Sequence, residues 1–263
     1  MAFDLNNFVI DRIVRGVALS QKDDSVLFSI NQIQNASLNC ASESTDAVDA
    51  LGTPIATFYR AKTAEFSAEN ALFDMNLMAT QLGTEKKIAS STSKVTVPAM
   101  ETFTVEEGGK YVLKHAPVTA PSEIYAINGD STFGVKYIKE TSASDVAFAY
   151  VEADHSITLP TGVAAGTEMF VMYEYESDKA VEVVNSAKNF PVGCKFVMEV
   201  LGCDVCDQTN LIYAYILFPN FKLSPDFDWS VATDGAHPFS GRAQQDYCDR
   251  EKKLFSVIIP GEE

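Results

Sequence analysis

Apolar and polar residues alternate along most of the chain, as in β-strands that bury one face. Residues 63–69 are a clear case, because Ala64, Phe66 and Ala68 fall on the same face. Before residue 94, further strands are expected at Val26–Ile30, Ala36–Cys40 and Ile55–Tyr59. After residue 177, strands are expected at Ala180–Val184, Lys195–Leu201, Leu211–Phe218 and Leu254–Ile259. The chain is therefore predicted to be mainly β.

One segment has helical spacing. Its apolar positions are Met75, Met78, Ala79 and Leu82. Asp74 precedes them where an N-cap acceptor is favoured, and Gly83 follows where a left-handed C-cap is favoured. We predict a short helix at Asp74–Leu82 that depends on tertiary packing. Its methionines are interpreted as core residues.

A polar stretch of small residues at Lys87–Lys94 marks a change of composition. From Val95 to about Glu176, short strands recur with turn signals between them, notably Gly108-Gly109 and Asn128-Gly129. We interpret residues 94–176 as an inserted immunoglobulin-like β-sandwich. Residues 1–93 and 177–263 would then form one discontinuous domain.

The charge of the chain is strongly negative. It has 36 acidic and 20 basic residues, a formal net charge of −16. Acidic and basic residues number 11 and 7 in residues 1–90, 12 and 5 in 91–176, and 13 and 8 in 177–263. Without a basic cluster, conventional recognition of a nucleic-acid backbone is not expected. The acidity favours solubility, or a surface that repels phosphate so that DNA slides past it.

Neither a membrane span nor a signal peptide is predicted. The chain has no apolar run long enough to cross a bilayer, and Met1–Asn7 lacks a basic start followed by an apolar stretch. The cysteines are odd in number and widely spaced, so we expect free thiols. They are Cys40, Cys194, Cys203, Cys206 and Cys248.

Cys203-Asp-Val-Cys206 has the ligand spacing of half a zinc site. No second pair with short spacing exists, so Cys194, Cys248 or His237 would have to complete it through folding. A redox Cys-x-x-Cys usually opens a helix, whereas this one lies between two predicted strands. We predict no metal here, with zinc binding at Cys203 and Cys206 as the alternative.

No other pattern indicates catalysis. The histidines His115, His155 and His237 lack a neighbouring histidine at metal-binding spacing or a nucleophile motif. Phosphate-binding glycine loops are absent from the sequence. The acidic pairs fall in predicted turns and form no recognisable catalytic pair: Asp23-Asp24, Glu106-Glu107 and Asp226/Asp228. We predict no catalytic, cofactor or metal site and no enzyme.

The order of motifs over residues 10–90 and 177–263 resembles the tail tube proteins of tailed bacteriophages. In the first stretch these motifs are residues 11–18, 35–40, 49–55 and 66–73. In the second they are residues 185–191, the strands 195–202 and 211–219, the loop 226–241 and the closing segment 246–260. The segment 94–176 departs from the simplest family members.

The resemblance implies a tail-tube-type β-sandwich or barrel with one short helix. Six copies would form a ring, and stacked rings would form a hollow tube that conducts DNA through an acidic lumen. The expected partners are further copies and other tail proteins such as a sheath, baseplate or terminator. The expected location is the virion tail, assembled in the host bacterial cytoplasm. No cofactor and no membrane is implied.

Residues 41–56 are expected to be a loop that reaches a neighbouring ring, with residues 1–25 and 246–263 as the other candidates. Two alternatives to a tube subunit remain. One is another tail component of related fold, such as a terminator, a hub or an injection-system tube. The other is an adhesion module that uses the inserted sandwich. The aromatic residues of 94–176 mostly alternate along strands, which favours core or cross-strand positions.

Overall fold

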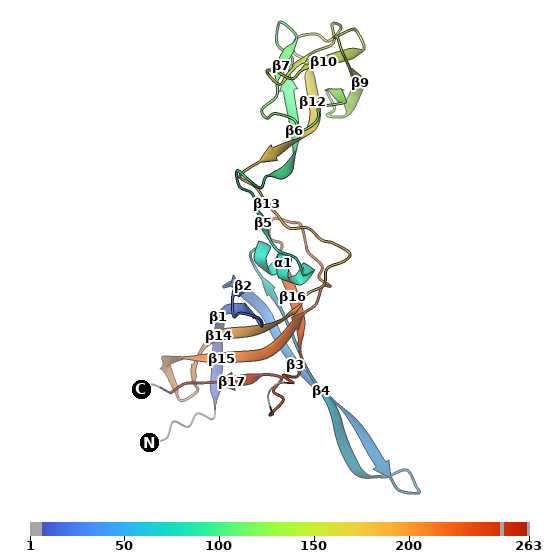
Figure 1. Cartoon of the computed structure of the whole chain (residues 1–263). Helices are drawn as coiled ribbons and strands as arrows, with labels where there is room; N and C mark the ends of the chain where they lie inside the picture. Colours follow the sequence, from blue (N-terminus) through green and yellow to red (C-terminus); the bar gives the residue numbers. More distant parts are fainter. Residues whose placement is uncertain (1–6, 248–249, 262–263) are drawn as a thin grey trace. The chain divides into compact units, whose positions relative to one another are not determined.

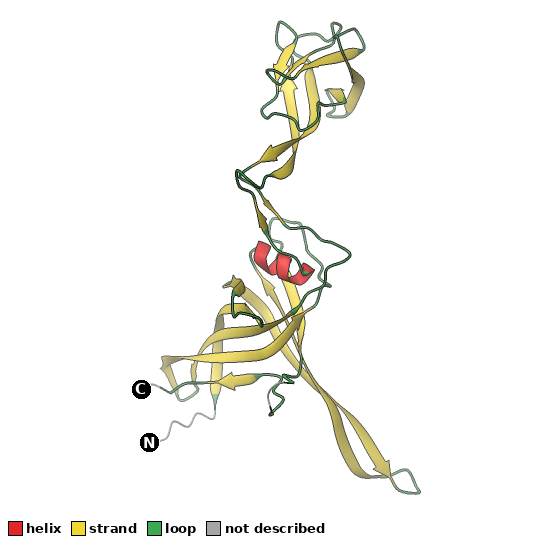
Figure 2. Ribbon diagram, viewed as in Figure 1, coloured by secondary structure: helices red, strands yellow, loops and turns green. Residues whose placement is uncertain are grey.

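The computed structural model describes residues 7–247 and 250–261. Over these residues the chain is mainly β with one short helix, as predicted (Figures 1 and 2). The chain divides into two compact units, which are Met1–Lys86 with Val183–Glu263 (unit 1) and Lys87–Glu182 (unit 2). Each unit has its own hydrophobic core.

Unit 1 is a curled, antiparallel sheet of eight strands in the order β2-β1-β14-β15-β16-β4-β3, with β17 also paired to β15 (Figure 1). The strands are β1 (Phe8–Ser20), β2 (Val26–Ile30), β3 (Ile33–Val48), β4 (Pro54–Asn70), β14 (Gly193–Asp204), β15 (Asp207–Leu223), β16 (His237–Ala243) and β17 (Ser256–Ile258). The concave side of a curled sheet can be filled by side chains from several strands.

Phenylalanines fill the core of unit 1. The predicted alternation in β4 is confirmed, because Ala64, Phe66 and Ala68 are buried. Phe66 lies at the centre of an aromatic cluster with Phe196 and Phe239, at ring-centroid distances of 5.9 Å to each. The burial of several large aromatic rings in one cluster gives the sheet a well-packed inner face.

Helix α1 (Met75–Leu82) confirms the predicted helix and both of its caps. The Asp74 carboxylate accepts hydrogen bonds from the backbone of Asn76 (2.9 Å) and Leu77 (2.7 Å). Gly83 ends the helix with φ 66°, in the left-handed region. Leu77 and Gln81 are fully buried and Ala79 and Leu82 are buried, whereas Met75 and Met78 are only partly buried. The prediction of a methionine-lined core face was therefore only partly right.

Two predicted loops are strands in the structure. Residues 41–56 belong to a long hairpin in which β3 and β4 pair as far as Val48 and Pro54. Its turn is closed by the Asp49 carboxylate, which accepts from the backbone of Leu51 and Thr53. Similarly, β14 and β15 are joined by Val205–Cys206 alone, a much shorter connection than the one left between the strands expected at Lys195–Leu201 and Leu211–Phe218. Near both turns the strand residues are largely solvated and polar. They therefore lack the alternation of apolar and polar residues by which a strand is predicted.

The main sheet of unit 2 has seven strands in the order β6-β12-β8-β9-β10-β11-β7. They are β6 (Val95–Thr104), β7 (Lys110–Val112), β8 (Glu123–Ile127), β9 (Phe133–Glu140), β10 (Ala147–Val151), β11 (Ser156–Thr158) and β12 (Glu168–Ser177). The immunoglobulin-like prediction is not confirmed. Such a fold has two packed antiparallel sheets, whereas here β9 and β10 are parallel neighbours in one sheet.

Of the two turn signals in unit 2, one marks a hairpin and one does not. Asn128-Gly129 lies between the antiparallel strands β8 and β9, as predicted. Gly108-Gly109 is a turn with φ 107° and 59°, but β7 pairs with β11 and is not a sheet neighbour of β6. A turn signal in the sequence predicts that the chain reverses direction. It does not determine which strands pair, because strand pairing depends on the packing of the whole sheet.

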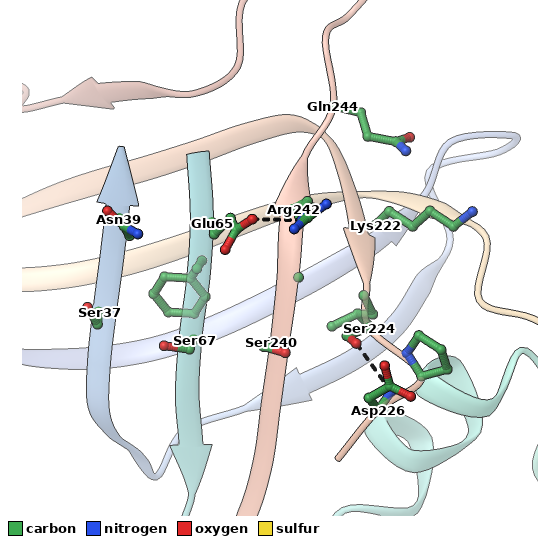
Figure 3. Close-up of a pocket in the computed structure, with 14 residues that line it drawn as sticks. Ser37, Asn39, Glu65, Ser67, Lys222, Ser224, Asp226, Ser240, Arg242 and Gln244 are labelled. Carbon is green, nitrogen blue, oxygen red and sulfur yellow. Dashed lines mark hydrogen bonds and ion pairs between the residues drawn. The ribbon is translucent and has the colours of Figure 1, made fainter. Parts of the chain in front are cut away.

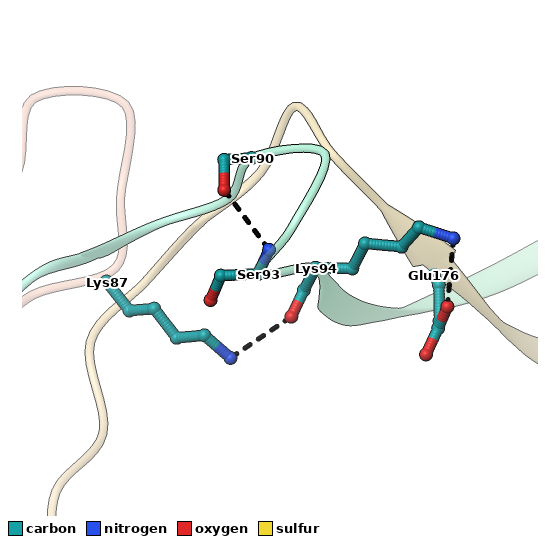
Figure 4. Close-up of polar contacts among 5 residues, drawn as sticks. All are labelled: Lys87, Ser90, Ser93, Lys94 and Glu176. Atoms are coloured by element: carbon teal, nitrogen blue, oxygen red, sulfur yellow. Dashed lines mark hydrogen bonds and ion pairs between the residues drawn. The ribbon is translucent and has the colours of Figure 1, made fainter.

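A second, two-stranded sheet pairs β5 (Lys87–Ile88) with β13 (Val181–Glu182). Figure 4 shows the polar contacts beside it. The Lys87 ammonium donates to the carbonyl oxygen of Lys94 (3.1 Å), and the Lys94 ammonium forms an ion pair with Glu176 (3.1 Å). The polar segment Lys87–Lys94 is therefore ordered by hydrogen bonds.

One carboxylate is buried in unit 2. Glu101, 3% exposed, accepts from the hydroxyls of Tyr111 (2.7 Å) and Tyr173 and from the backbone of Lys114 (3.1 Å). A buried carboxylate costs free energy unless it is hydrogen-bonded, and here three donors satisfy it. Burial, and then the Glu101 carboxylate, raise the pKa of Tyr111 to about 12.

Candidate assembly surfaces

The outer part of hairpin β3–β4 is a two-stranded ribbon that extends away from the sheet of unit 1 (Figure 1). Every residue from 39 to 63 is exposed. They include large apolar side chains, with Leu51 91% exposed and Ile55 and Tyr59 also largely in solvent. An isolated two-stranded hairpin is marginally stable in water, and open apolar strand edges tend to pair with other chains. This ribbon therefore has the properties of a surface that a partner covers.

The sheet of unit 1 also has open edges. Strand β3 lies at the end of the strand order, so its outer edge has no partner within the described residues. On β15, β17 pairs with Tyr215–Leu217 and β16 with Phe221–Leu223. The remaining edge at residues 211–214 is unpaired in the described part of the chain. Residues 8–20 are strand β1, which lies inside the sheet, so most of the candidate arm 1–25 is a structural strand.

Part of the sheet surface opposite the phenylalanine core is apolar. Val17, Val197 and Leu217 lie opposite one another on β1, β14 and β15 and are partly buried. Farther along β15, Leu211 and Tyr213 are 49% and 47% exposed. Exposed apolar residues on neighbouring strands are typical of protein contact surfaces.

The corresponding surface of β3, β4 and β16 is polar and hollowed into a groove of about 870 Å³ (Figure 3). One cross-strand row consists of Ser37, Ser67 and Ser240. The next row is Asn39, Glu65, Arg242 and Lys222. Glu65 and Arg242 form an ion pair at 2.7 Å between Oε1 and Nε. This surface is suited to contact with water and polar partners.

His237 is a structural residue. It is fully buried, and the backbone of Asp74 donates to its Nδ1 (3.4 Å) while its Nε2 lies 2.8 Å from Oε1 of Gln81. Phe73 stacks against the imidazole at 5.2 Å. Burial lowers the pKa of His237, and the Asp74 carboxylate partly opposes this shift. Both ring nitrogens are engaged, so His237 has no free ligand atom.

The other histidines and the acidic pairs considered from the sequence do not come together in one site. His115 stacks on Tyr175 at 3.9 Å, and Nδ1 of His155 lies 3.3 Å from the hydroxyl of Tyr150, both within unit 2. The acidic pairs lie exposed in turns and loops: Asp23-Asp24, Glu106-Glu107 and Asp226/Asp228. Hydrogen bonds from Ser20 and Ser25 lower the pKa of Asp23, as expected for an acid that orders a turn.

The cysteines are also separate. Cys203 is partly exposed and Cys206 exposed at the β14–β15 turn. Cys194 is buried, donates its thiol to the carbonyl of Phe221, and has its pKa raised to about 12 by burial. Cys248 lies outside the described residues. Within residues 7–247 and 250–261, no group of three or more His, Cys, Asp or Glu could hold a metal ion.

A mainly β subunit with open strand edges and exposed contact surfaces is typical of proteins that function by assembly. The model of the YomU/Tube protein family matches residues 8–255. The chain belongs to this family and is a phage tail tube protein, so the predicted resemblance is confirmed. The match also includes residues 94–176. No curated protein matches the chain.

The family is structural, so the protein is not an enzyme. In the described ranges, no helix has the length and apolar character needed to cross a membrane. Membership of the tail tube family is consistent with a location in the virion tail.

Proposed function

We propose that six copies of this protein form a ring and that stacked rings form the hollow tail tube through which DNA passes during infection. The observation that carries this proposal is the exposed hairpin β3–β4. A ribbon with large apolar side chains and two open edges needs a covering partner, and in a tube that partner is another copy.

The open edges of the sheet support ring formation. The outer edge of β3 and the free part of β15 lie on different strands of unit 1. Contact between two different surfaces of identical subunits is a head-to-tail interface, and such an interface generates a ring when the rotation between subunits closes. The apolar side chains of Leu211 and Tyr213 beside the free part of β15 add contact area to such an interface.

Passage of DNA is supported by charge. A formal net charge of −16 makes the assembled wall repel phosphate, so DNA passes without tight binding. The tube joins other tail proteins such as a baseplate, a terminator or a sheath, and assembly takes place in the host bacterial cytoplasm. These partners follow from the role of a tube subunit.

Residues 94–176 are proposed to decorate the tube or thicken its wall. A second candidate function for them is binding, favoured by one observation. Phe133 is 60% exposed and contacts Tyr125 and Phe170 at 5.4 and 4.9 Å between ring centroids. An exposed aromatic cluster can serve as an adhesion surface. Deletion of residues 94–176 is expected to leave assembly intact, and loss of infectivity with intact tubes would support adhesion.

Negative-stain electron microscopy of the purified protein at increasing concentration tests the tube function. Hollow filaments or stacked rings with a pore wide enough for duplex DNA are expected. A single ring that never lengthens would indicate a terminator-like component. A protein that stays monomeric in the presence of the baseplate would argue against self-assembly and for the binding module.

A further inference from the structure

The polar groove of unit 1 has a regular chemical organisation. Three serines, Ser37, Ser67 and Ser240, form one row across three adjacent strands, and their hydroxyls line the groove (Figure 3). Side chains opposite one another on neighbouring strands lie about 5 Å apart, so the row is a continuous polar strip. It differs from the surface of β1, β14 and β15, where Val17, Val197 and Leu217 form an apolar part beside the Arg15–Glu199 ion pair.

The second row contains two cations side by side. Arg242 on β16 and Lys222 on β15 are directly opposed. Like charges in this position destabilise a sheet unless an anion lies between or beside them. Glu65 pairs with Arg242 at 2.7 Å, whereas the Lys222 ammonium forms no ion pair or hydrogen bond within the described residues. The Lys222 ammonium is therefore available to an anion that enters the groove.

Acidic residues surround this cationic pair. Glu69 and Asp228 line the hollow beside the groove, and Asp226 lines both. The surface thus combines two adjacent cations with a larger number of carboxylates. A phosphate backbone would be attracted at one point and repelled elsewhere, so contact would be brief.

We propose that this face of β3, β4 and β16 is the wall of the lumen that faces DNA, and that Lys222 and Arg242 are its contact point for DNA phosphates. This inference rests on the proposed function. Only one face of each subunit can line the lumen. The apolar surface near Val197 and Leu217 is then assigned to contacts between subunits. Glu65, Glu69, Asp226 and Asp228 are then the acids that line the lumen.

Thiol labelling of assembled filaments tests the assignment. A Ser67→Cys variant places a thiol on the central strand of the face, and Val146→Cys places one on an exposed position of unit 2. Filaments are treated with a small maleimide or with a polymer-coupled maleimide too large to enter the lumen. Peptide mass spectrometry separates these sites from the native cysteines. Both sites should react with both reagents in dispersed subunits.

In filaments, Cys at position 67 is expected to react with the small reagent only, while the control at position 146 reacts with both. Reaction of position 67 with the polymer reagent would place the face outside and overturn the inference. Protection from both reagents would place it between subunits and also overturn it. Failure of the unmodified protein to form filaments would instead overturn the proposed function.

The phosphate contact has its own test. Retention of short duplex DNA by filaments is measured against salt concentration for Lys222→Glu and for Lys188→Glu, which makes the same charge change outside the groove. Lys222→Glu should weaken retention and reduce the salt slope by about one, with Lys188→Glu close to the unmodified protein. Equal effects of both variants, or no retention by the unmodified protein, would overturn the role of Lys222.

Discussion

The Nε2 of His237 lies 2.8 Å from Oε1 of Gln81 and thereby connects strand β16 to helix α1. The amide nitrogen of Gln81 in turn donates to the carbonyl oxygen of Pro238 (3.1 Å), which fixes its oxygen toward the imidazole. Since Asp74 donates its backbone N–H to Nδ1, the imidazole is neutral with its proton on Nε2. Protonation of Nδ1 would remove this bond beside the N-cap of α1.

The stability of unit 1 should therefore fall in mild acid. The pKa of His237 is lowered by burial in the folded protein, so the unfolded chain binds more protons below about pH 6.5. The His237 contribution is complete above that pH and declines as the pH falls toward the folded pKa. The free energy of unfolding is measured by chemical denaturation at several pH values between about 7.5 and 5, the range in which histidine titrates. In His237→Asn the free energy of unfolding should depend less on pH. An unchanged pH dependence would show that carboxylates, and not His237, cause it.

Glu101→Gln should destabilise unit 2. The substitution keeps the size but removes the charge and one acceptor, so Tyr111, Tyr173 or the backbone of Lys114 loses a partner. We expect a loss of about 1.5–3 kcal/mol, the range for hydrogen bonds to a charged group. Thermal unfolding measures it, with the exposed Glu107→Gln as a control that should unfold like the unmodified protein.

Gly83→Ala should destabilise the end of α1. The residue has φ 66°, and an added Cβ would overlap the carbonyl oxygen of Phe190. The backbone strain alone is of order 1–3 kcal/mol. Gly52→Ala is the matched control, because Gly52 has φ 86° with nothing within 4 Å of an added Cβ. Denaturant titration measures the free energy of unfolding of both variants. A larger loss for Gly83→Ala than for Gly52→Ala is expected from the overlap with Phe190, and equal losses would contradict it.

Substitution of Leu51 and Tyr59 by serine should abolish filaments and leave folding unchanged. Both side chains are exposed in the subunit, so their removal costs little in the isolated protein. In the proposed tube a neighbouring copy would bury them, so their loss should weaken each contact. The measurements are thermal unfolding of the subunit and electron microscopy of filaments. Val146→Ser in unit 2 is a control that should assemble, and filaments of normal length in the double variant would contradict the hairpin interface.

Native mass spectrometry after incubation with zinc should show the chain without a bound ion. Cys203 and Cys206 lie at a hairpin turn, and no third ligand joins them within the described residues. Two thiolates alone do not complete a tetrahedral structural site. A mass excess of one zinc ion that disappears in Cys206→Ser would establish the metal site instead.

The sequence predicted those features that depend on local chemistry. Asp74 and Gly83 cap α1. Few residue types are favoured at these two cap positions, so the ends of the helix could be predicted from the sequence. The buried face of β4 was readable from Ala64, Phe66 and Ala68. The strands near Ser44 and Asp204 were not, because neither face of their hairpin ends is buried and the alternation disappears.

Features that depend on distant contacts were also missed. Nothing near Lys222 in the chain indicates that Arg242 and Glu65 lie beside it, since three strands far apart in sequence form that row. The buried role of His237 depends on Gln81, a polar residue outside the apolar positions that predicted the helix. The pairing of β7 with β11 is likewise a choice of sheet order, which short-range turn signals do not encode.

The pairing of β5 with β13 has a practical consequence for engineering. Lys87 and Glu182 are cross-strand partners, so the chain leaves unit 1 and returns to it at neighbouring points. A domain whose own termini are adjacent could replace unit 2 at this junction without stretching the parent chain. The junction is thus a natural position for displaying a foreign domain or for closing the gap with a short turn.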